Sequence, residues 1–183
     1  GCSKNIGKSI AIKLSKQGVN IIAIARSKKN LQSLKKEIDK YSNDNHILVL
    51  DLLKKNSLKK IKKFIDDKKI KIEILVHNLG GSLGIKDPNA SSKIWKEVWE
   101  YNIGIAIDIN NMIIPYMKKL KWGRIVHISS YATTTNLGYA PYVSAKGALE
   151  SYVKSISKIL SKNNITMNCA APGLVNLKGR YFS

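Results

Sequence analysis

Five short apolar runs separated by helical patterns restrict the fold of this chain more than any other feature of its sequence. The first run, VNIIAIA at 19–25, is nearly continuous, as expected of a strand buried on both faces. Four further runs share its β-branched character: HILVL at 46–50, IEILVH at 72–77, GRIVHIS at 123–129 and ITMNCA at 165–170. Strands alternating with helices at this spacing predict a parallel sheet.

The segments between these runs carry apolar residues at helical spacing. Stripes recur over 6–14, 31–38 and 58–65, and Gly18 is a suitable cap for the first of them. Longer patterns predict helices over about Ser92–Ile109 and Pro141–Lys162. We therefore predict an α/β fold, a doubly wound parallel sheet with helices on both faces. No repeat or linker divides the 183 residues, so we expect one domain over 1–183.

The two ends of the sequence indicate a fragment. The opening GCSKNIG is typical of the turn that follows a strand, and the closing GLVNLKGRYFS does not resemble a finished terminus. We expect a first strand before Gly1 and further chain after Ser183.

Charge and composition narrow the classes of partner. The net charge is +20, from 32 basic and 12 acidic residues, but the lysines are scattered over every predicted element and no basic strand carries aromatic side chains. This pattern predicts a basic surface rather than a nucleic-acid site. No apolar run approaches a membrane span, no signal peptide is present, and Cys2 and Cys169 lack metal-ligand spacing. We expect a cytoplasmic protein without a metal site.

The glycine loop at the start predicts a phosphate site. Gly1, Lys4 and Gly7 open a helix whose N-terminal N–H groups suit a pyrophosphate, although a glycine turn is often only a turn. Arg26 follows the first run, and no Asp or Glu lies between 19 and 32. Lys4 and Arg26 would hold a 2′-phosphate, which favours NADPH over NADH; the alternative is that both are solvated surface charges.

The stretch HISSYATTTNLGYAPYVSAK, residues 127–146, predicts proton chemistry. Tyr142 and Lys146 are one helical turn apart and project from one helix face. The ammonium favours the phenolate form of the tyrosine, which suits proton transfer at working pH. Pro141 fits the first turn of such a helix because it has no N–H to leave unpaired.

Taken in order, the glycine loop and the motifs VLDLL, HNLGG, EYNIG, IVHISS, YVSAK and NCAAPG resemble the short-chain dehydrogenase/reductase family over nearly the whole chain. Within it the chain is most similar to the 3-oxoacyl-[acyl-carrier-protein] reductases. The resemblance implies a Rossmann-like fold and NADPH-dependent reduction of a carbonyl to an alcohol, with a 3-oxoacyl thioester of fatty acid biosynthesis as the expected substrate. A sugar or polyol dehydrogenase is the alternative within the family, and a nucleotide-binding module without turnover is the alternative outside catalysis.

The resemblance also implies roles for individual residues. Tyr142 is expected to be the catalytic acid and Lys146 to hold the nicotinamide ribose. Ser130 is expected to orient the carbonyl together with Tyr142, with Ser129 as its rival. Asn102 is expected to hold a water that connects Lys146 to solvent. The residues expected to bind the cofactor are Gly1, Ser3, Lys4, Asn5, Ile6, Gly7, Arg26, Asp51, Leu52, Asn78, Leu79, Gly80, Tyr142, Lys146, Pro172, Gly173 and Val175.

The sequence departs from the family pattern at several positions. Asn5 stands in place of the second loop glycine, and Thr133 in place of a common Gly. His77 replaces an Asn, and we interpret it as a hydrogen-bonding residue at a strand end. Leu177 replaces a Thr expected against the nicotinamide.

Two features concern partners. In relatives, the helix that here carries Trp95 and Trp99 and the Tyr142 helix pair with a neighbouring subunit, which implies a homotetramer or homodimer; the alternative for the tryptophans is an intramolecular core. The run Lys118, Lys119 and Lys121 would offer an acidic carrier protein a contact at the edge of the site.

Overall fold

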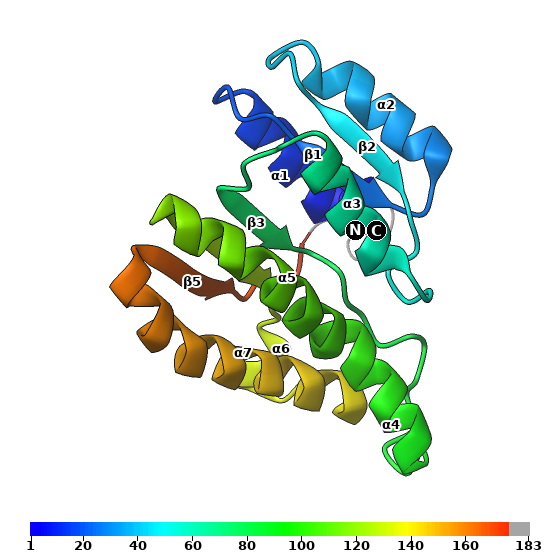
Figure 1. Ribbon diagram of the computed structural model, residues 1–183. Coiled ribbons are helices and arrows are strands. Elements are labelled where there is room, and N and C mark those ends of the chain that lie inside the picture. The colour runs from blue at the N-terminus through cyan, green and yellow to red at the C-terminus, as the bar shows by residue number, and fades with distance from the viewer. Residues whose placement is uncertain (176–183) are drawn as a thin grey trace. The chain divides into compact units, whose positions relative to one another are not determined.

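The computed structural model describes residues 1–175 and has the predicted α/β architecture, parallel strands flanked by helices (Figure 1). All five predicted strands form, and each pairs in parallel with a sequence neighbour. Contacts along the chain separate it into two compact units, Gly1–Ile61 and Lys62–Ser183. The expectation of one domain stays a prediction.

The first unit holds one pair of strands and its helices. The strands β1 (Ile22–Ala25) and β2 (His46–Val49) pair in register, with Ile22 opposite His46. Helices α1 (Asn5–Ser15) and α2 (Lys28–Ile38) supply most of its core, and Cys2 packs against it. The buried residues of this core are Ala11, Ala23, Leu31, Leu34 and Ile38. The stripe over 31–38 is therefore the buried face of α2, whereas of the stripe over 6–14 only Ala11 is fully buried, between Gly7 and Ser15.

Helix α3 (Ser57–Asp67) crosses the boundary between the units, and the second unit contains the larger sheet. Its strands follow the order β3 (Ile74–His77), β4 (Gly123–Ile128) and β5 (Ile165–Ala170). Along β4 buried and partly buried residues alternate, as a strand's two-residue period requires. Because all three strands are parallel, their carboxyl ends share one edge of the sheet.

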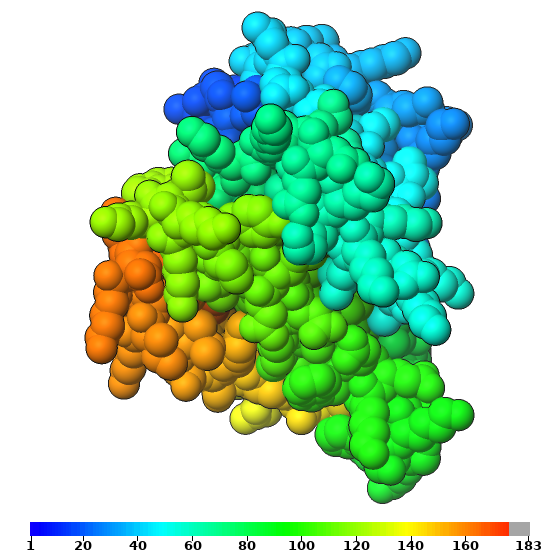
Figure 2. Space-filling view, in the orientation of Figure 1, coloured from blue at the N-terminus to red at the C-terminus, as the bar shows by residue number. Residues whose placement is uncertain are grey.

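Helices cover this sheet on the face to which the buried β4 side chains point. Of these helices, α5 (Ile105–Leu120) and α7 (Ala140–Leu160), which ends in a 3₁₀ turn (Ser161–Asn163), pack against the strands. Three shorter elements pack against α7: α4 (Ser92–Trp99), a π-helical turn (Glu100–Gly104) and α6 (Ala132–Thr135). In Figure 2 the atoms of α5, in green, and α7, in yellow to orange, meet directly. The fold thus packs two long helices, α5 and α7, side by side on one face of the sheet (Figure 1).

One sequence-based prediction of local structure is wrong. The helix expected to end at Ile109 continues through α5 to Leu120, because Ile113 and Met117 extend the buried stripe. Pro115 lies within it, on the side away from the sheet. Thr133, which stands in place of a common Gly, lies in the short helical turn α6.

No helix among residues 1–175 is long and apolar enough to cross a membrane. In the same part of the chain no cluster of His, Cys, Asp and Glu has a metal-binding arrangement, and both cysteines are free thiols.

Candidate functional site

The candidate site lies at the carboxyl end of β4, where backbone hydrogen bonds continue beyond the strand. Ser129 N donates to Ala170 O at 2.7 Å, and Tyr131 N donates to Pro172 O at 3.0 Å. The backbone on both sides of Ser130 is therefore hydrogen-bonded to the end of β5 and the residues that follow it. A side chain on such a rigid segment keeps a fixed position.

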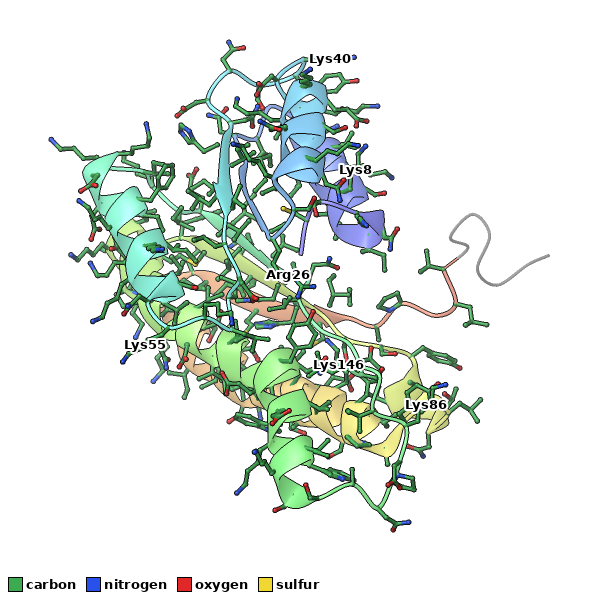
Figure 3. All side chains as sticks on the ribbon, turned by 90° about the vertical axis from the view of Figure 1, so that its right-hand side faces the viewer. Lys8, Arg26, Lys40, Lys55, Lys86 and Lys146 are labelled. Atoms are coloured by element: carbon green, nitrogen blue, oxygen red, sulfur yellow. The ribbon has the colours of Figure 1, made fainter. Side chains whose placement is uncertain are left out.

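Tyr142 and Lys146 come from the first turns of α7. Lys146 Nζ lies 5.9 Å from the centre of the Tyr142 ring. The same ammonium donates to Ile128 O at 2.8 Å, so one side chain ties the α7 helix to the end of β4 (Figure 3). Lys146 is only 3% exposed. Its burial lowers the pKa of the ammonium to about 8, against the opposing effects of Cys169 and Glu150.

The two adjacent serines have different environments. Ser129 is buried, and its hydroxyl donates to Glu150 Oε1 at 2.5 Å. Ser130 is half-buried, and its Oγ accepts a hydrogen bond from Ala132 N at 3.2 Å. Within residues 1–175 the Ser130 hydroxyl donates to no protein acceptor. Of the two hydroxyls, only that of Ser130 keeps its hydrogen unused by the described residues.

Asn102 lies in the π-helical turn and is almost fully buried. Its Nδ2 donates to Gly81 O and to Val98 O, both at 2.8 Å, and its Oδ1 accepts from Gly81 N at 2.9 Å. Both amide hydrogens are thus used within the protein. The side chain pins the loop after β3, and π-helical turns of this kind are frequent at functional sites.

Gly80, in that loop, has no room for a side chain. A Cβ at this position would lie 2.6 Å from Asn102 Oδ1 and 2.8 Å from Lys146 Nζ, and the backbone φ is +155°. The loop therefore runs close to both polar groups, which only glycine allows.

A buried polar network lies beside this loop. His77 Nε2 meets Asn110 Oδ1 at 2.8 Å, and Asn110 Nδ2 meets His127 Nε2 at 3.2 Å and Tyr152 Oη at 3.0 Å. The two imidazoles stack with centres 4.3 Å apart. Burial lowers the pKa of His77 to about 4, and burial together with His77 and Lys146 depresses the pKa of His127 still further. The prediction that His77 is a hydrogen-bonding strand-end residue is confirmed.

Since Asn110 donates to His127 Nε2, that ring carries its hydrogen on Nδ1. His127 Nδ1 is buried and has no hydrogen-bond partner among the described residues. Neutral histidines therefore fill this part of the core, and both rings serve packing and hydrogen bonding.

The other predicted cofactor residues of the second unit lie at the same sheet edge. Asn78, Leu79 and Gly80 follow β3, and Pro172, Gly173 and Val175 follow β5. Leu177 lies outside the described residues. The parallel register, with His77, His127 and Cys169 side by side, places these segments on either side of the β4 end.

The remaining predicted residues belong to the first unit. Lys4 precedes α1, and Asn5 adopts the left-handed conformation with φ 49°, which Asn tolerates better than most residues. Arg26 follows β1 and is exposed (Figure 3). Asp51 and Leu52 follow β2. Since β1 and β2 are parallel, these last three residues share one sheet edge.

The lysine run expected at the edge of the site is placed elsewhere. Lys118 and Lys119 end α5 and Lys121 follows it, just before β4 begins at Gly123. The candidate site lies past the other end of β4, six residues on. That expectation is wrong, because a parallel crossover returns the chain to the amino end of the next strand.

The model of the family described as short chain dehydrogenase matches residues 1–180. The chain belongs to the short-chain dehydrogenase family. It is therefore an oxidoreductase of a family that binds NAD or NADP.

Similarity to individual members of the short-chain dehydrogenase family is broad. The chain is 32% identical to 3-oxoacyl-[acyl-carrier-protein] reductase FabG of Aquifex aeolicus over 177 residues, 96% of this chain and 71% of that one. A 7 alpha-hydroxysteroid dehydrogenase complexed with NADH and 7-oxo glycochenodeoxycholic acid superposes with a TM-score of 0.86 at 26% identity, covering 94% and 68% of the two chains. L-sorbose reductase from Gluconobacter frateurii, complexed with NADPH and L-sorbose, superposes with a TM-score of 0.87 at 25% sequence identity. The match covers 95% of this chain and 67% of that one.

The residues present fit the dinucleotide that short-chain dehydrogenases bind. The Lys146 ammonium donates one of its three hydrogens to Ile128 O, so two remain for a ligand. Gly80, which lies close to Asn102 and Lys146, presents backbone rather than a side chain at the site. In the first unit, α1 begins without a side-chain cap on its N–H groups. A helix start of this kind suits a phosphate.

Sequence reasoning missed three residues that organise this short-chain dehydrogenase site. The Glu150 carboxylate accepts a hydrogen bond from Ser129, and the backbone of Gly81 is hydrogen-bonded to the Asn102 side chain. Asn110 is hydrogen-bonded to both His77 and His127. One signal was available: Glu150 is two helical turns after Tyr142 and therefore lies on the same helix face.

Proposed function

We propose that this protein is an NADPH-dependent reductase that converts the carbonyl of a 3-oxoacyl thioester to an alcohol. The observation that carries the proposal is the position of Lys146, whose ammonium lies beside the Tyr142 ring and bonds the backbone two residues before Ser130. A tyrosine, a buried ammonium and a serine with an available hydroxyl are the groups that carbonyl reduction needs.

Each group has a defined task in this reaction. NADPH supplies the hydride. Tyr142 donates its phenolic proton to the carbonyl oxygen, and Ser130 donates a hydrogen bond to the same oxygen. Lys146 favours the phenolate that this proton transfer leaves. Asn102 holds the Gly81 backbone through two hydrogen bonds, next to Gly80, where an added Cβ would meet Lys146 Nζ.

Exposed apolar side chains favour an acyl substrate. Tyr131, Leu137 and Tyr139 are 52%, 77% and 40% exposed, and all three lie between Ser130 and Tyr142. Lys86 Nζ lies 5.9 Å from the centre of the Tyr139 ring, which adds a cation at the same place (Figure 3). An acyl chain attached to an anionic carrier would match this combination, and the FabG similarity supports the same substrate class.

Two positive charges favour NADPH. Arg26 follows β1 and is exposed, and residues 19–32 contain no carboxylate that would repel a 2′-phosphate. Arg binds phosphate through paired N–H groups, and Lys4 adds a second charge.

We also propose a homotetramer or homodimer; Trp99 on α4 is 41% exposed, as a subunit contact requires.

A sugar or polyol ketone is the second candidate substrate, favoured by the structural similarity to L-sorbose reductase. It predicts turnover of small polar ketones and little gain from an acyl chain.

The test uses the full-length protein and follows oxidation of NADPH and NADH with a short 3-oxoacyl thioester and with L-sorbose. We expect NADPH-selective turnover of the thioester that is lost in Tyr142→Phe, with cofactor binding retained. Near-normal turnover by Tyr142→Phe would refute the proposed role. Tight NADPH binding without turnover of any carbonyl would favour a nucleotide-binding module.

A further inference from the structure

One carboxylate on α7 holds both sides of the serine segment. Glu150 Oε1 accepts from Ser129 Oγ at 2.5 Å and from Thr133 Oγ1 at 2.9 Å. Ser129 immediately precedes Ser130, and Thr133 lies three residues after it. These contacts run from the helix that carries Tyr142 to the segment that carries Ser130.

Thr133 extends the contact to Ser130 itself. Its Oγ1 also lies 2.8 Å from Ser130 O, and its backbone N donates to the same carbonyl at 3.1 Å. A hydroxyl has one hydrogen, so Thr133 shares it between Glu150 and Ser130 O. The Glu150 carboxylate therefore fixes the turn in which Ser130 lies.

We propose that Glu150 is a positioning residue that sets the place of Ser130 relative to Tyr142. The inference rests on the proposed function, since it explains how the two groups that meet the carbonyl oxygen keep their separation. Effective proton transfer and hydrogen bonding need positions held within a fraction of an ångström. Lys146 and Glu150 both tie α7 to the β4 end, Lys146 through Ile128 O and Glu150 through the serine turn.

Glu150 has a second effect through its charge. The charged or titratable groups that act at Lys146 are Glu150 on α7, Cys169 on β5, and the two stacked histidines on β3 and β4. The Tyr142 ring also lies beside its ammonium. Burial raises the pKa of the Cys169 thiol to about 11, and both histidines are neutral at working pH. The Glu150 carboxylate is thus the anion that raises the pKa of the neighbouring Lys146.

Two substitutions separate geometry from charge. Glu150→Gln keeps an acceptor oxygen of the same reach but removes the charge, and Glu150→Ala removes both. We expect Glu150→Ala to lower kcat about 10- to 100-fold with unchanged cofactor binding. Glu150→Gln should restore most of kcat and move the alkaline limb of the pH profile to lower pH. Glu97→Gln is the matched control, because it makes the same change from carboxylate to carboxamide at an exposed position on α4. Its kcat and pH profile should equal those of the wild type.

The contacts can also be tested without turnover. Amide hydrogen exchange in the full-length protein should speed up over 130–135 in Glu150→Ala and in Ser129→Ala/Thr133→Val, and stay unchanged along α7. Unchanged exchange over 130–135 would overturn the inference, whatever the substrate is. Equal loss of kcat in the Gln and Ala variants, with no shift of the pH profile, would also overturn it. Absence of turnover in the wild type would count against the proposed function alone.

Discussion

The buried histidine pair makes the stability of the protein sensitive to mild acid. His77 is buried and neutral, with a pKa lowered from 6.5 to about 4 by loss of solvent, although its hydrogen bond to Asn110 opposes the shift. A histidine in the unfolded chain takes up a proton near pH 6.5, whereas the folded one does not until about pH 4. The free energy of unfolding must therefore fall as the pH drops through this window.

The magnitude follows from the two pKa values. One pKa unit corresponds to about 1.4 kcal/mol, so a single such histidine removes about 2.5 kcal/mol of stability between about pH 7.5 and about pH 4.5. His127 acts in the same direction, because its pKa is also depressed. Carboxylates with lowered pKa, such as Asp39, lose their contribution in a lower pH range, so they do not mask the effect.

The perturbation is His77→Gln, whose amide nitrogen can donate to Asn110 Oδ1 but does not titrate. We expect the variant to lose about 2.5 kcal/mol less than the wild type over this range. The assay is urea unfolding of the full-length protein, followed by tryptophan fluorescence at both pH values with constant m-value. If His77→Gln shows the wild-type dependence on pH, the buried neutral histidine is not the cause.

Three further predictions concern the site. Gly80→Ala should lower kcat at least about 10-fold, because its Cβ displaces Asn102 or Lys146, whereas Gly147→Ala on α7 meets no atom and should be neutral; steady-state kinetics would show the contrast. The pH profile of kcat/KM should fall on its alkaline side with a midpoint near 8, where Lys146 loses its proton, and a midpoint near 10 would contradict the buried ammonium. Arg26→Glu should move cofactor preference from NADPH toward NADH by about 10-fold or more, with Lys28→Glu as the exposed control; equal KM values for both cofactors in wild type and variant would contradict it.

Local sequence patterns were sufficient to locate the five strands and most of the helices. Runs such as ITMNCA and the stripe over 31–38 identify β5 and the buried face of α2, because burial follows the two- and 3.6-residue periods of strand and helix. The one-turn spacing of Tyr142 and Lys146 likewise places both on the first turns of one helix. Their roles were implied by the resemblance and stay proposals.

Long-range contacts could not be predicted in this way. The end of α5, the choice between Ser129 and Ser130, and the position of the lysine run all depend on which elements pack together. Two adjacent serines in a sequence do not reveal which of their hydroxyls donates a hydrogen bond to a carboxylate twenty-one residues away. The sequence by itself determined where the strands and most of the helices lie and which types of group the chain carries. The tertiary structure alone decided which of those groups are buried, paired or left available, because burial and partners arise only when distant segments meet.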